Sequence, residues 1–296
     1  MIDSAIDTAK LGLARFGAYR KLFALARPAE EELQTARVVC IASGKGGTGK
    51  SVVATNLAVA RASTGERVCL IDFDAGLANA HLLLGLAPEF DLGHVMQGEK
   101  MASEALVEGP AGLRLLSGGV GRHVLSNPTR RDLDRLFRAL RPLESSFDLV
   151  VIDHGAGLSY PTLTHLAAAS LLLLVTNHEV TALSDAYALY KRAHLINPYI
   201  RVGLVVNRSP SEEAALGAWE RFRSAAQRFL GHAPDWVGSV PADMAVQRSV
   251  EQRSPVLIAE PASAAARALA SIAAWGPIDH AKTARSFFER ARAALR

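Results

Sequence analysis

Residues 44–51 read Gly44-Lys45-Gly46-Gly47-Thr48-Gly49-Lys50-Ser51, which satisfies the pattern G-x-x-x-x-G-K-[ST]. A strand-like apolar run precedes this segment, and a helical pattern without proline until Pro88 follows it. Glycines allow backbone N–H groups to converge on phosphate oxygens, and a helix N-terminus adds partial positive charge. We therefore expect a phosphate-binding loop in which Lys50 neutralises the β- and γ-phosphates and the Ser51 hydroxyl joins a Mg²⁺ shell. The alternative is a glycine-rich turn that holds no ligand.

Apolar runs alternate with helix-length segments from Arg37 onward. The strand-like runs are Val38–Ala42, Val68–Asp72, Leu149–Asp153, Leu171–Thr176, Val202–Asn207 and Trp236–Val240. The helical segments lie near residues 51–62, 129–141, 160–169, 180–196 and 211–230. Continuous apolar strands joined by helices indicate a sheet that is buried on both faces. We expect an α/β fold over residues 37–276, with a mostly parallel twisted sheet and helices on both faces.

Carboxylates stand at the ends of two strand-like runs. Asp72 and Asp74 end the second run, and Asp153 ends the third, before His154-Gly155-Ala156-Gly157. In an open parallel sheet, ligand chemistry collects at the carboxyl ends of the strands. A carboxylate there can hold Mg²⁺ through water, and a second one can orient an attacking water molecule. Each of the three could instead cap a helix, but beside a phosphate-binding loop we expect them to belong to its site.

The composition of the 296 residues excludes several classes of protein. About half of the residues (49%) are hydrophobic and 21% are charged, so the chain can bury a large core. Cys40 and Cys69 lie in apolar runs, which argues against a disulfide scaffold, and the histidines show no metal-site spacing. No apolar run reaches the ~18–20 residues of a membrane span and no secretory signal is visible, so we expect a soluble cytoplasmic protein. A net charge of +4 is small for a dedicated nucleic-acid binder, but it leaves an anionic partner open.

Several strings of the sequence resemble one family. A lysine at the second position of the loop, here Lys45, defines the deviant phosphate loop of the MinD/ParA class of ATPases. Further strings resemble the FlhG/FleN proteins, MinD-like regulators of flagellar number. These strings are Ile71–Asn79 with Leu82–Leu86, Asp91–Val95, Val107–Leu113, Asp153–Gly157, Asp185–Leu189, Val205–Arg208 and Gly238–Asp243. The resemblance covers roughly residues 37–260 and implies a MinD-like P-loop NTPase fold.

The resemblance also implies cofactors and site residues. ATP and Mg²⁺ would be the cofactors, with the phosphates held by Gly44 to Ser51 and the adenine faced by Asn207, Pro241 and Asp243. Lys45 would serve the nucleotide of the partner subunit in an ATP-dependent homodimer. Asp74 would place the attacking water. The metal-site residues would be Ser51, Asp74 and Asp153, the last holding the Mg²⁺ shell.

The implied function is a slow, regulatory ATPase that limits the number or position of flagella. Its partner would be an FlhF-like GTPase or a transcription factor. Two features depart from the family, because His154 stands where a hydroxyl residue is usual and the N-terminal arm lacks the Asp-Gln-Ala motif that stimulates FlhF. A ParA-like partition ATPase held on DNA and a MinD-like division-site ATPase remain alternatives. A metabolic or metal-cluster enzyme is disfavoured, because no cysteine pair or substrate motif is visible.

Helical segments flank the expected domain on both sides. Residues 1–36 form an arm in which basic residues interleave with apolar ones, closed by Pro28 and Glu30–Glu32. The segment 277–296 contains a helix over about 281–296 with one apolar and one basic side. The apolar arc consists of Ala284, Phe287, Phe288, Ala291, Ala294 and Leu295, and the basic side of Lys282, Arg285, Arg292 and Arg296. Such a helix predicts reversible binding to anionic lipid at the inner membrane face, and the alternative is a helix docked on the core.

Overall fold

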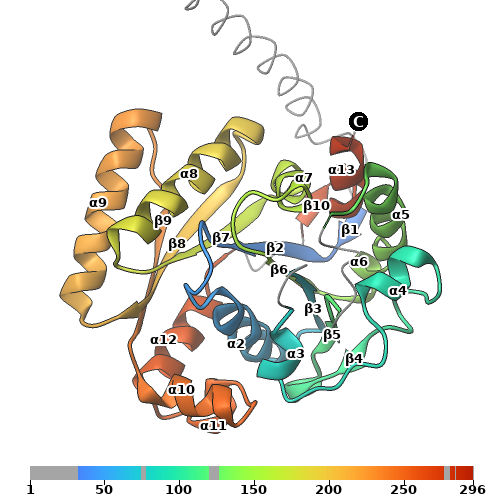
Figure 1. Ribbon diagram of the computed structural model, residues 1–296, viewed down its shortest axis with the longest axis horizontal. Coiled ribbons are helices and arrows are strands. Elements are labelled where there is room, and N and C mark those ends of the chain that lie inside the picture. Colours follow the sequence, from blue (N-terminus) through green and yellow to red (C-terminus); the bar gives the residue numbers. More distant parts are fainter. Residues whose placement is uncertain (1–32, 75–77, 120–126, 277–280, 284, 296) are drawn as a thin grey trace, which may run out of the picture.

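The computed structural model describes residues 33–74, 78–119, 127–276, 281–283 and 285–295 (Figure 1). The arm predicted over residues 1–36 lies, up to residue 32, outside the described residues. The main sheet formed by the described residues has eight strands. Their order across the sheet is β4 (Val107–Glu108), β5 (Arg114–Leu116), β3 (Val68–Phe73), β6 (Leu149–His154), β2 (Arg37–Ala42), β7 (Leu171–Thr176), β8 (Arg201–Ser209) and β9 (Asp235–Pro241).

Neighbouring strands of this sheet run parallel, except for the antiparallel pair β4 and β5. All six predicted strands are present, and each end lies within two residues of its predicted position. Strands β4 and β5 were not predicted, because two and three residues are too few to show a pattern. The prediction of a mostly parallel sheet is confirmed.

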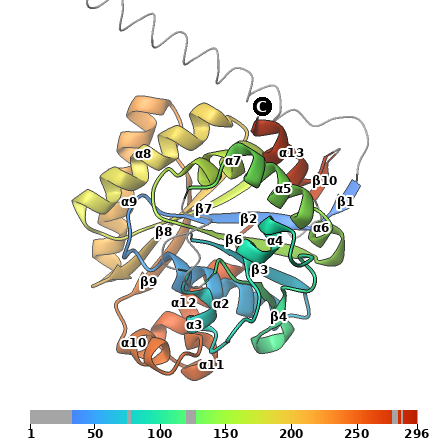
Figure 2. The ribbon, with the colours of Figure 1, turned by 45° about the vertical axis from the view of Figure 1, so that its right-hand side comes forward.

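Helices cover both faces of the sheet, as predicted (Figures 1 and 2). One face carries α4 (Leu92–Gln97), α5 (Arg130–Leu140), α6 (Leu143–Ser146), α7 (Tyr160–Ala168), α8 (Val180–Ile196), α9 (Glu212–Leu230) and α13 (Phe287–Ala294). The other carries α2 (Lys50–Ala62), α3 (Ala80–Leu83), the 3₁₀ turn η1 (Pro110–Gly112), α10 (Met244–Glu251), α11 (Val256–Ala259) and α12 (Ala264–Ala273). Successive strand side chains point to opposite faces, so the strands contribute to two hydrophobic clusters, one under each layer of helices.

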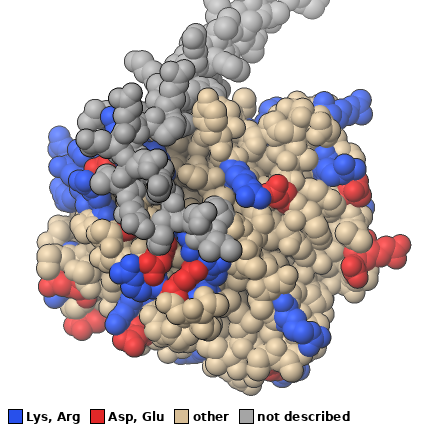
Figure 3. Space-filling view, turned by 180° about the vertical axis from the view of Figure 1, so that it is seen from behind, with Lys and Arg blue, Asp and Glu red and all other residues tan. Residues whose placement is uncertain are grey.

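The surface of the described residues agrees with the modest charge of the chain. On the face shown in Figure 3, lysine and arginine side chains lie close to aspartate and glutamate side chains, with wide uncharged areas between them. This mixture is consistent with a net charge of +4. Among the helices that the structure describes, none is long and apolar enough to cross a membrane.

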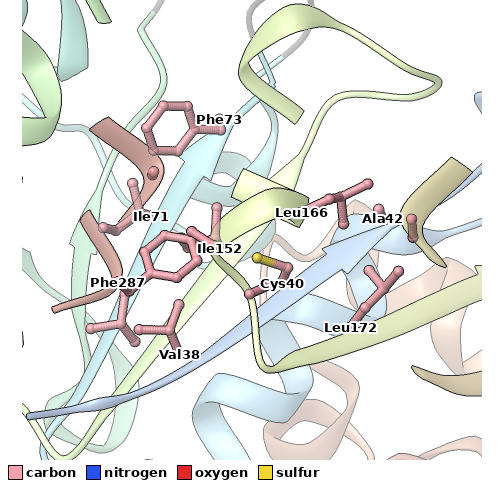
Figure 4. Packing of buried hydrophobic residues seen from close by; sticks show 14 of the residues in the cluster. Val38, Cys40, Ala42, Ile71, Phe73, Ile152, Leu166, Leu172 and Phe287 are labelled. Carbon is pink, nitrogen blue, oxygen red and sulfur yellow. The ribbon is translucent and has the colours of Figure 1, made fainter. Parts of the chain in front are cut away.

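The first hydrophobic cluster lies where the C-terminal helix meets the sheet. Figure 4 shows Phe287 of α13 beside Val38 and Cys40 of β2 and Ile152 of β6. Cys40 and Cys69 are fully buried and free, and burial raises the pKa of both thiols. Both cysteines are therefore core residues, in agreement with their positions in apolar runs.

The C-terminal segment differs from the predicted single helix over about 281–296. Strand β10 (Ala281–Thr283) pairs antiparallel with β1 (Leu33–Thr35), and α13 begins only at Phe287. A capping box sets this start, because the Ser286 hydroxyl accepts a hydrogen bond from the Glu289 N–H and the Glu289 carboxylate accepts one from the Ser286 N–H. The predicted boundary is thus corrected by six residues at the beginning of the helix.

Four residues of the predicted apolar arc, Phe287, Phe288, Ala291 and Leu295, are buried against the core, which is the alternative that the sequence left open, whereas Ala284 lies outside the described residues. Phe287, Phe288 and Leu295 are at most 4% exposed, and α13 packs against α5 and α7. The buried carboxylate of Glu144 accepts hydrogen bonds from the N–H groups of Phe287 at 2.7 Å and Phe288 at 2.8 Å. The Glu144 carboxylate therefore stabilises the N-terminus of α13 through the helix dipole. In this conformation the buried apolar side chains are not accessible to lipid.

Candidate functional site

The loop formed by residues 44–51 links the carboxyl end of β2 to the first turn of α2. Gly47 and Gly49 have φ angles of 78° and 81°, a left-handed conformation that glycine adopts without strain. Gly44 leaves no room for a side chain, because a Cβ atom there would lie 2.2 Å from the backbone carbonyl carbon of Asp185. The predicted loop therefore has a backbone that only glycines permit, and α8 packs directly against it.

A buried ion pair lies beneath this loop. Lys50 Nζ is 2.6 Å from Asp153 Oδ1, and the two side chains are 6% and 0% exposed. Burial raises the pKa of Asp153, while the adjacent Lys50 ammonium opposes that rise. Asp153 Oδ2 and the Thr48 hydroxyl are buried without a hydrogen-bond partner among the described residues. Buried polar atoms are rarely left unsatisfied, so these two indicate a site prepared for a polar ligand.

The other two predicted carboxylates lie at the same edge of the sheet but differ in role. Asp72 pairs in register with Asp153, and its oxygens accept hydrogen bonds from the N–H groups of Asp74 at 2.9 Å and Ala80 at 3.1 Å. Burial and the charge of Asp153 raise the pKa of Asp72. Asp72 therefore fixes the backbone at Asp74 and Ala80. The Asp74 carboxylate lies beside Gly155, where an added Cβ would come within 3.5 Å of Asp74 Oδ1.

Two adjoining cavities open at the loop. The first has a volume of about 780 Å³ and is lined by Gly46–Ser51 and Asp74, with residues of α3 and of the α10 end also contributing. The second has a volume of about 640 Å³ and shares Gly49 and Val52 with the first. Cavities of this size accommodate a small-molecule ligand. We expect phosphates in the first, the phosphate-side cavity, and a base in the second, the base-side cavity.

The residues expected to face an adenine line this second cavity, but two of their side chains are engaged within the protein. Asn207 Nδ2 donates to the carbonyl of Thr48 at 2.8 Å. The Asp243 carboxylate accepts hydrogen bonds from the N–H groups of Ala245 at 2.9 Å and Ala265 at 3.1 Å, and these bonds lower its pKa. Asn207 thus joins β8 to the phosphate loop, and Asp243 joins α10 to α12. Both side chains shape the cavity wall.

Lys45 is held by α8, apart from the buried Lys50 pair. Its Nζ lies 2.7 Å from Glu179 Oε2 and 3.1 Å from Thr181 Oγ1. The side chains of Lys45 and Glu179 are 31% and 53% exposed, so solvent screens this ion pair. A pair of this kind opens easily, which leaves Lys45 free to reach another charged group.

Comparisons with known proteins agree with this geometry. Residues 39–256 match the model of the CobQ/CobB/MinD/ParA nucleotide binding domain. The chain belongs to this family. It is 32% identical over 237 residues to the antiactivator FleN of Pseudomonas aeruginosa, covering 80% of this chain and 85% of FleN. It is 29% identical to the flagellum site-determining protein YlxH of Helicobacter pylori, covering 73% of this chain and 74% of YlxH.

A solved relative supports the same assignment. The septum site-determining protein MinD of Pyrococcus horikoshii, complexed with Mg-ADP, superposes with a TM-score of 0.68 at 26% identity. The alignment covers 80% of this chain and 94% of that MinD chain. The MinD/ParA-type P-loop fold predicted from the sequence is therefore confirmed.

The oxygen donors of this MinD/ParA-family site fit a magnesium ion. The Ser51 hydroxyl and the Asp74 and Asp153 carboxylates are hard ligands. Within the described part of the chain, no group of three or more His, Cys, Asp or Glu side chains is placed to hold a metal by itself. This arrangement suits Mg²⁺, which keeps several waters and takes one or two protein carboxylates together with substrate phosphates.

Three residues that contact the loop or line its cavities were missed by sequence reasoning. Glu179 holds Lys45. Arg208 has a φ of 55°, donates to the Gly47 carbonyl at 3.2 Å and lines the second cavity. Arg253 lines the first cavity. Arg208 lies in a string already singled out, but no sequence signal separates Glu179 or Arg253 from other surface charges.

Two buried histidines connect the site with α13. His154 ends β6, and its ring centroid lies 5.0 Å from that of His165 on α7. The His165 ring also lies 4.6 Å from the ring of Phe73 at the end of β3 and 5.5 Å from that of Phe287 on α13. None of the four imidazole nitrogens has a hydrogen-bond partner among the described residues. The ends of β3 and β6 thus meet α13 through one ring.

Replacing His165 with leucine is expected to make the fold less sensitive to acid. Burial lowers the pKa of His165 from 6.5 to about 3. Between these values the unfolded chain binds a proton that the folded chain does not, so stability falls as the pH falls. This residue alone should remove about 2 kcal/mol between pH 7.5 and pH 5. Denaturant unfolding at both pH values should show a smaller loss for His165→Leu, and equal losses would contradict the assignment of a neutral buried imidazole.

Proposed function

We propose that this chain is an ATP-dependent molecular switch of the FlhG/FleN type, which binds Mg·ATP and hydrolyses it slowly. The observation that carries the proposal is the phosphate loop with both Lys45 and Lys50, opening into cavities that have room for a nucleotide. The similarity to FleN over 80% of the chain supports the flagellar assignment. ATP and Mg²⁺ fit the unsatisfied oxygens and the hard donors of the site.

The proposed chemistry uses residues that the fold has already gathered. Lys50 exchanges Asp153 for the β- and γ-phosphates, because a phosphate presents more negative charge to the same ammonium. Ser51 and the released Asp153 carboxylate would hold the hydrated metal ion, and Asp74 would orient the attacking water. Bound Mg²⁺ supplies the positive charge that neutralises the developing charge on the phosphates.

We infer that ATP favours a homodimer. Lys45 is held by exposed contacts with Glu179 and Thr181, so it can exchange them for the nucleotide of a second copy. Leu158, Tyr160 and Val180 are 42%, 45% and 75% exposed. Leu158 follows β6, Tyr160 begins α7 and Val180 begins α8, so all three lie at the carboxyl edge of the sheet with the loop. A second copy that faces the loop would bury these apolar side chains, which favours association.

We propose that α13 allows this cytoplasmic switch to associate reversibly with anionic lipid at the inner membrane face. Because Phe287 and Phe288 are buried, α13 must leave the core before its apolar arc can enter a membrane. The ends of β3 and β6, which carry the site carboxylates, contact α13 through His165, so nucleotide state can bias this equilibrium. Sedimentation with anionic vesicles should be greater with ATP than with ADP, and binding independent of nucleotide would contradict the proposal.

The proposed partner is a flagellar regulatory protein, either an FlhF-like GTPase or a transcription factor. FleN is named an antiactivator and YlxH a flagellum site-determining protein, which favours this class of partner. The second candidate is a partition or division-site ATPase, favoured by the similarity to the septum site-determining MinD. Its partner surface would be DNA or a septum regulator instead.

A deletion strain separates these two functions. Cells that lack the gene are expected to carry too many or misplaced flagella, because the switch that limits their assembly is lost. Flagella are counted by electron microscopy in wild-type, deletion and complemented strains. Normal flagella together with lost chromosomes or misplaced septa would overturn the flagellar assignment and favour the second candidate.

A further inference from the structure

Arg253 stands at a backbone position that favours glycine. Helix α10 ends with the N–H of Arg253 donating to the Val250 carbonyl at 3.0 Å and the N–H of Ser254 donating to the Ser249 carbonyl at 2.9 Å. This closure places Arg253 at a φ of 52°, in the left-handed region. Glycine is the usual residue at such a helix end, because a Cβ atom is strained there. Strained backbone at non-glycine residues gathers at binding sites, so the conformation of Arg253 favours a role in binding.

Arg253 also lines the phosphate-side cavity, an observation that is independent of its backbone conformation. Of the described residues that line the phosphate-side cavity, two are cations, Lys50 and Arg253. Lys50 is paired with Asp153, whereas no ion pair or side-chain hydrogen bond joins Arg253 to another described residue. Arg253 is absent from the lining of the base-side cavity, although Val250 and Glu251 line both. Its charge is therefore placed beside the space for phosphates.

The turn that carries Arg253 also packs against the segment that follows Asp74. Figures 1 and 2 both place α10 and α11 beside α2 and α3. A Cβ atom at Gly85 would lie 2.8 Å from the carbonyl oxygen of Arg253. Burial lowers the pKa of His81 on α3, and the positive charge of Arg253 lowers it further. Arg253 thus lies near α3 and lines the same cavity as the phosphate loop.

We propose that Arg253 is a second phosphate-binding cation of this site, contacting the α- and β-phosphates from the side opposite the loop. The proposal rests on the nucleotide binding proposed above and adds a residue that no part of the loop pattern includes. An arginine donates several N–H groups in a planar fork that matches phosphate oxygens. Contact with a bound phosphate also holds the α10–α11 turn against Gly85, so Arg253 links nucleotide occupancy to the segment after Asp74.

The glycine variant tests this proposal without adding strain. Arg253→Gly removes the charge while giving the left-handed position the residue it favours, so thermal stability should stay equal or rise. The dissociation constants of N-methylanthraniloyl-ATP and -ADP should both increase about tenfold, the size of one charge-assisted contact at a partly exposed site. Competition by unlabelled adenosine, which has no phosphate, should be unchanged. Arg253→Lys, which keeps the charge, should recover part of the loss.

A matched control removes one positive charge elsewhere. Arg228 lies at the end of α9 that precedes β9, near the sheet edge opposite the loop. The Arg228→Ala variant should therefore leave both dissociation constants unchanged. Unchanged ATP and ADP affinity in Arg253→Gly would overturn the role of Arg253, as would a loss confined to ATP-driven dimerisation. Lys50→Ala distinguishes the two proposals. If Lys50→Ala and Arg253→Gly both bind nucleotide normally, the proposed nucleotide site is wrong. If only Lys50→Ala loses nucleotide binding, the site stands and the proposed role of Arg253 is wrong.

Discussion

Lys50→Ala is expected to raise the dissociation constant for ATP at least about 100-fold, because it removes the charge-assisted contact to the β- and γ-phosphates. The structure adds a second expectation. Asp153 is 0% exposed and paired with Lys50 at 2.6 Å, so the substitution leaves a buried carboxylate without its partner. Loss of one member of a buried ion pair destabilises a protein by about 3–5 kcal/mol. Fluorescent-nucleotide titration and denaturant unfolding measure the two effects separately.

A second substitution tells lost binding from lost folding. In the Lys50→Ala, Asp153→Asn double variant, the unpaired charge is gone, so much of the folding stability should return. Nucleotide affinity should not return, because the cation that contacts the phosphates is still absent. A double variant that is stable and binds ATP as tightly as the wild type would show that Lys50 has only a structural role. If Lys50→Ala alone is fully stable, the buried pair does not exist in solution.

The sheet and the phosphate loop were predictable because their signals are local. Each of the six long strands is a continuous apolar run, and the loop is a contiguous string of eight residues. Asp72 and Asp153 could be placed at one edge because parallel strands end at the same edge. The distinct role of Asp72 could not be foreseen, since it depends on hydrogen bonds from the N–H groups of Asp74 and Ala80.

The placement of α13 could not be predicted from the periodicity of its apolar residues. An apolar arc beside a basic one is the same pattern whether the arc meets a membrane or a protein core. Whether the apolar side of α13 packs on the core depends on α5, α7 and the carboxylate of Glu144. Glu144 lies 143 residues before Phe287 in the chain. The beginning of the helix was misplaced because the Ser286 capping box was overlooked, although its pattern is visible in the sequence.

The contacts of Lys45 and Arg253 lay beyond sequence reasoning for different reasons. The Lys45 contact with Glu179 spans 134 residues and depends on how α8 packs against Gly44. The position of Arg253 depends on a φ angle that the sequence pattern would have assigned to glycine. The resemblance implies that Asn207 and Asp243 face an adenine, and both line the second cavity. The hydrogen bonds that engage their side chains depend on the fold and could not be read from the sequence.

Asp74→Ala is expected to block ATP hydrolysis, and Lys45→Ala is expected to block ATP-dependent dimerisation. Asp74 lines the phosphate-side cavity beside Gly155. Orientation of the attacking water acts mainly in the transition state. Asp74→Ala should therefore bind ATP within about threefold of the wild type but turn it over about 100- to 1,000-fold more slowly. With ATP present it should accumulate as a dimer in sedimentation velocity.

Lys45→Ala should retain ATP binding in the monomer, because Lys50 and the loop backbone remain, yet fail to form dimers with ATP. The Glu179→Gln variant is the matched control, because it frees Lys45 from its exposed pair and should leave dimerisation intact or strengthen it. The same three measurements, nucleotide titration, sedimentation and ATP turnover, are made on all three variants. Loss of nucleotide binding in Lys45→Ala would place Lys45 at its own site and remove the cross-subunit role. Wild-type turnover in Asp74→Ala would remove Asp74 from the mechanism, because a residue that positions the attacking water cannot be dispensable for hydrolysis.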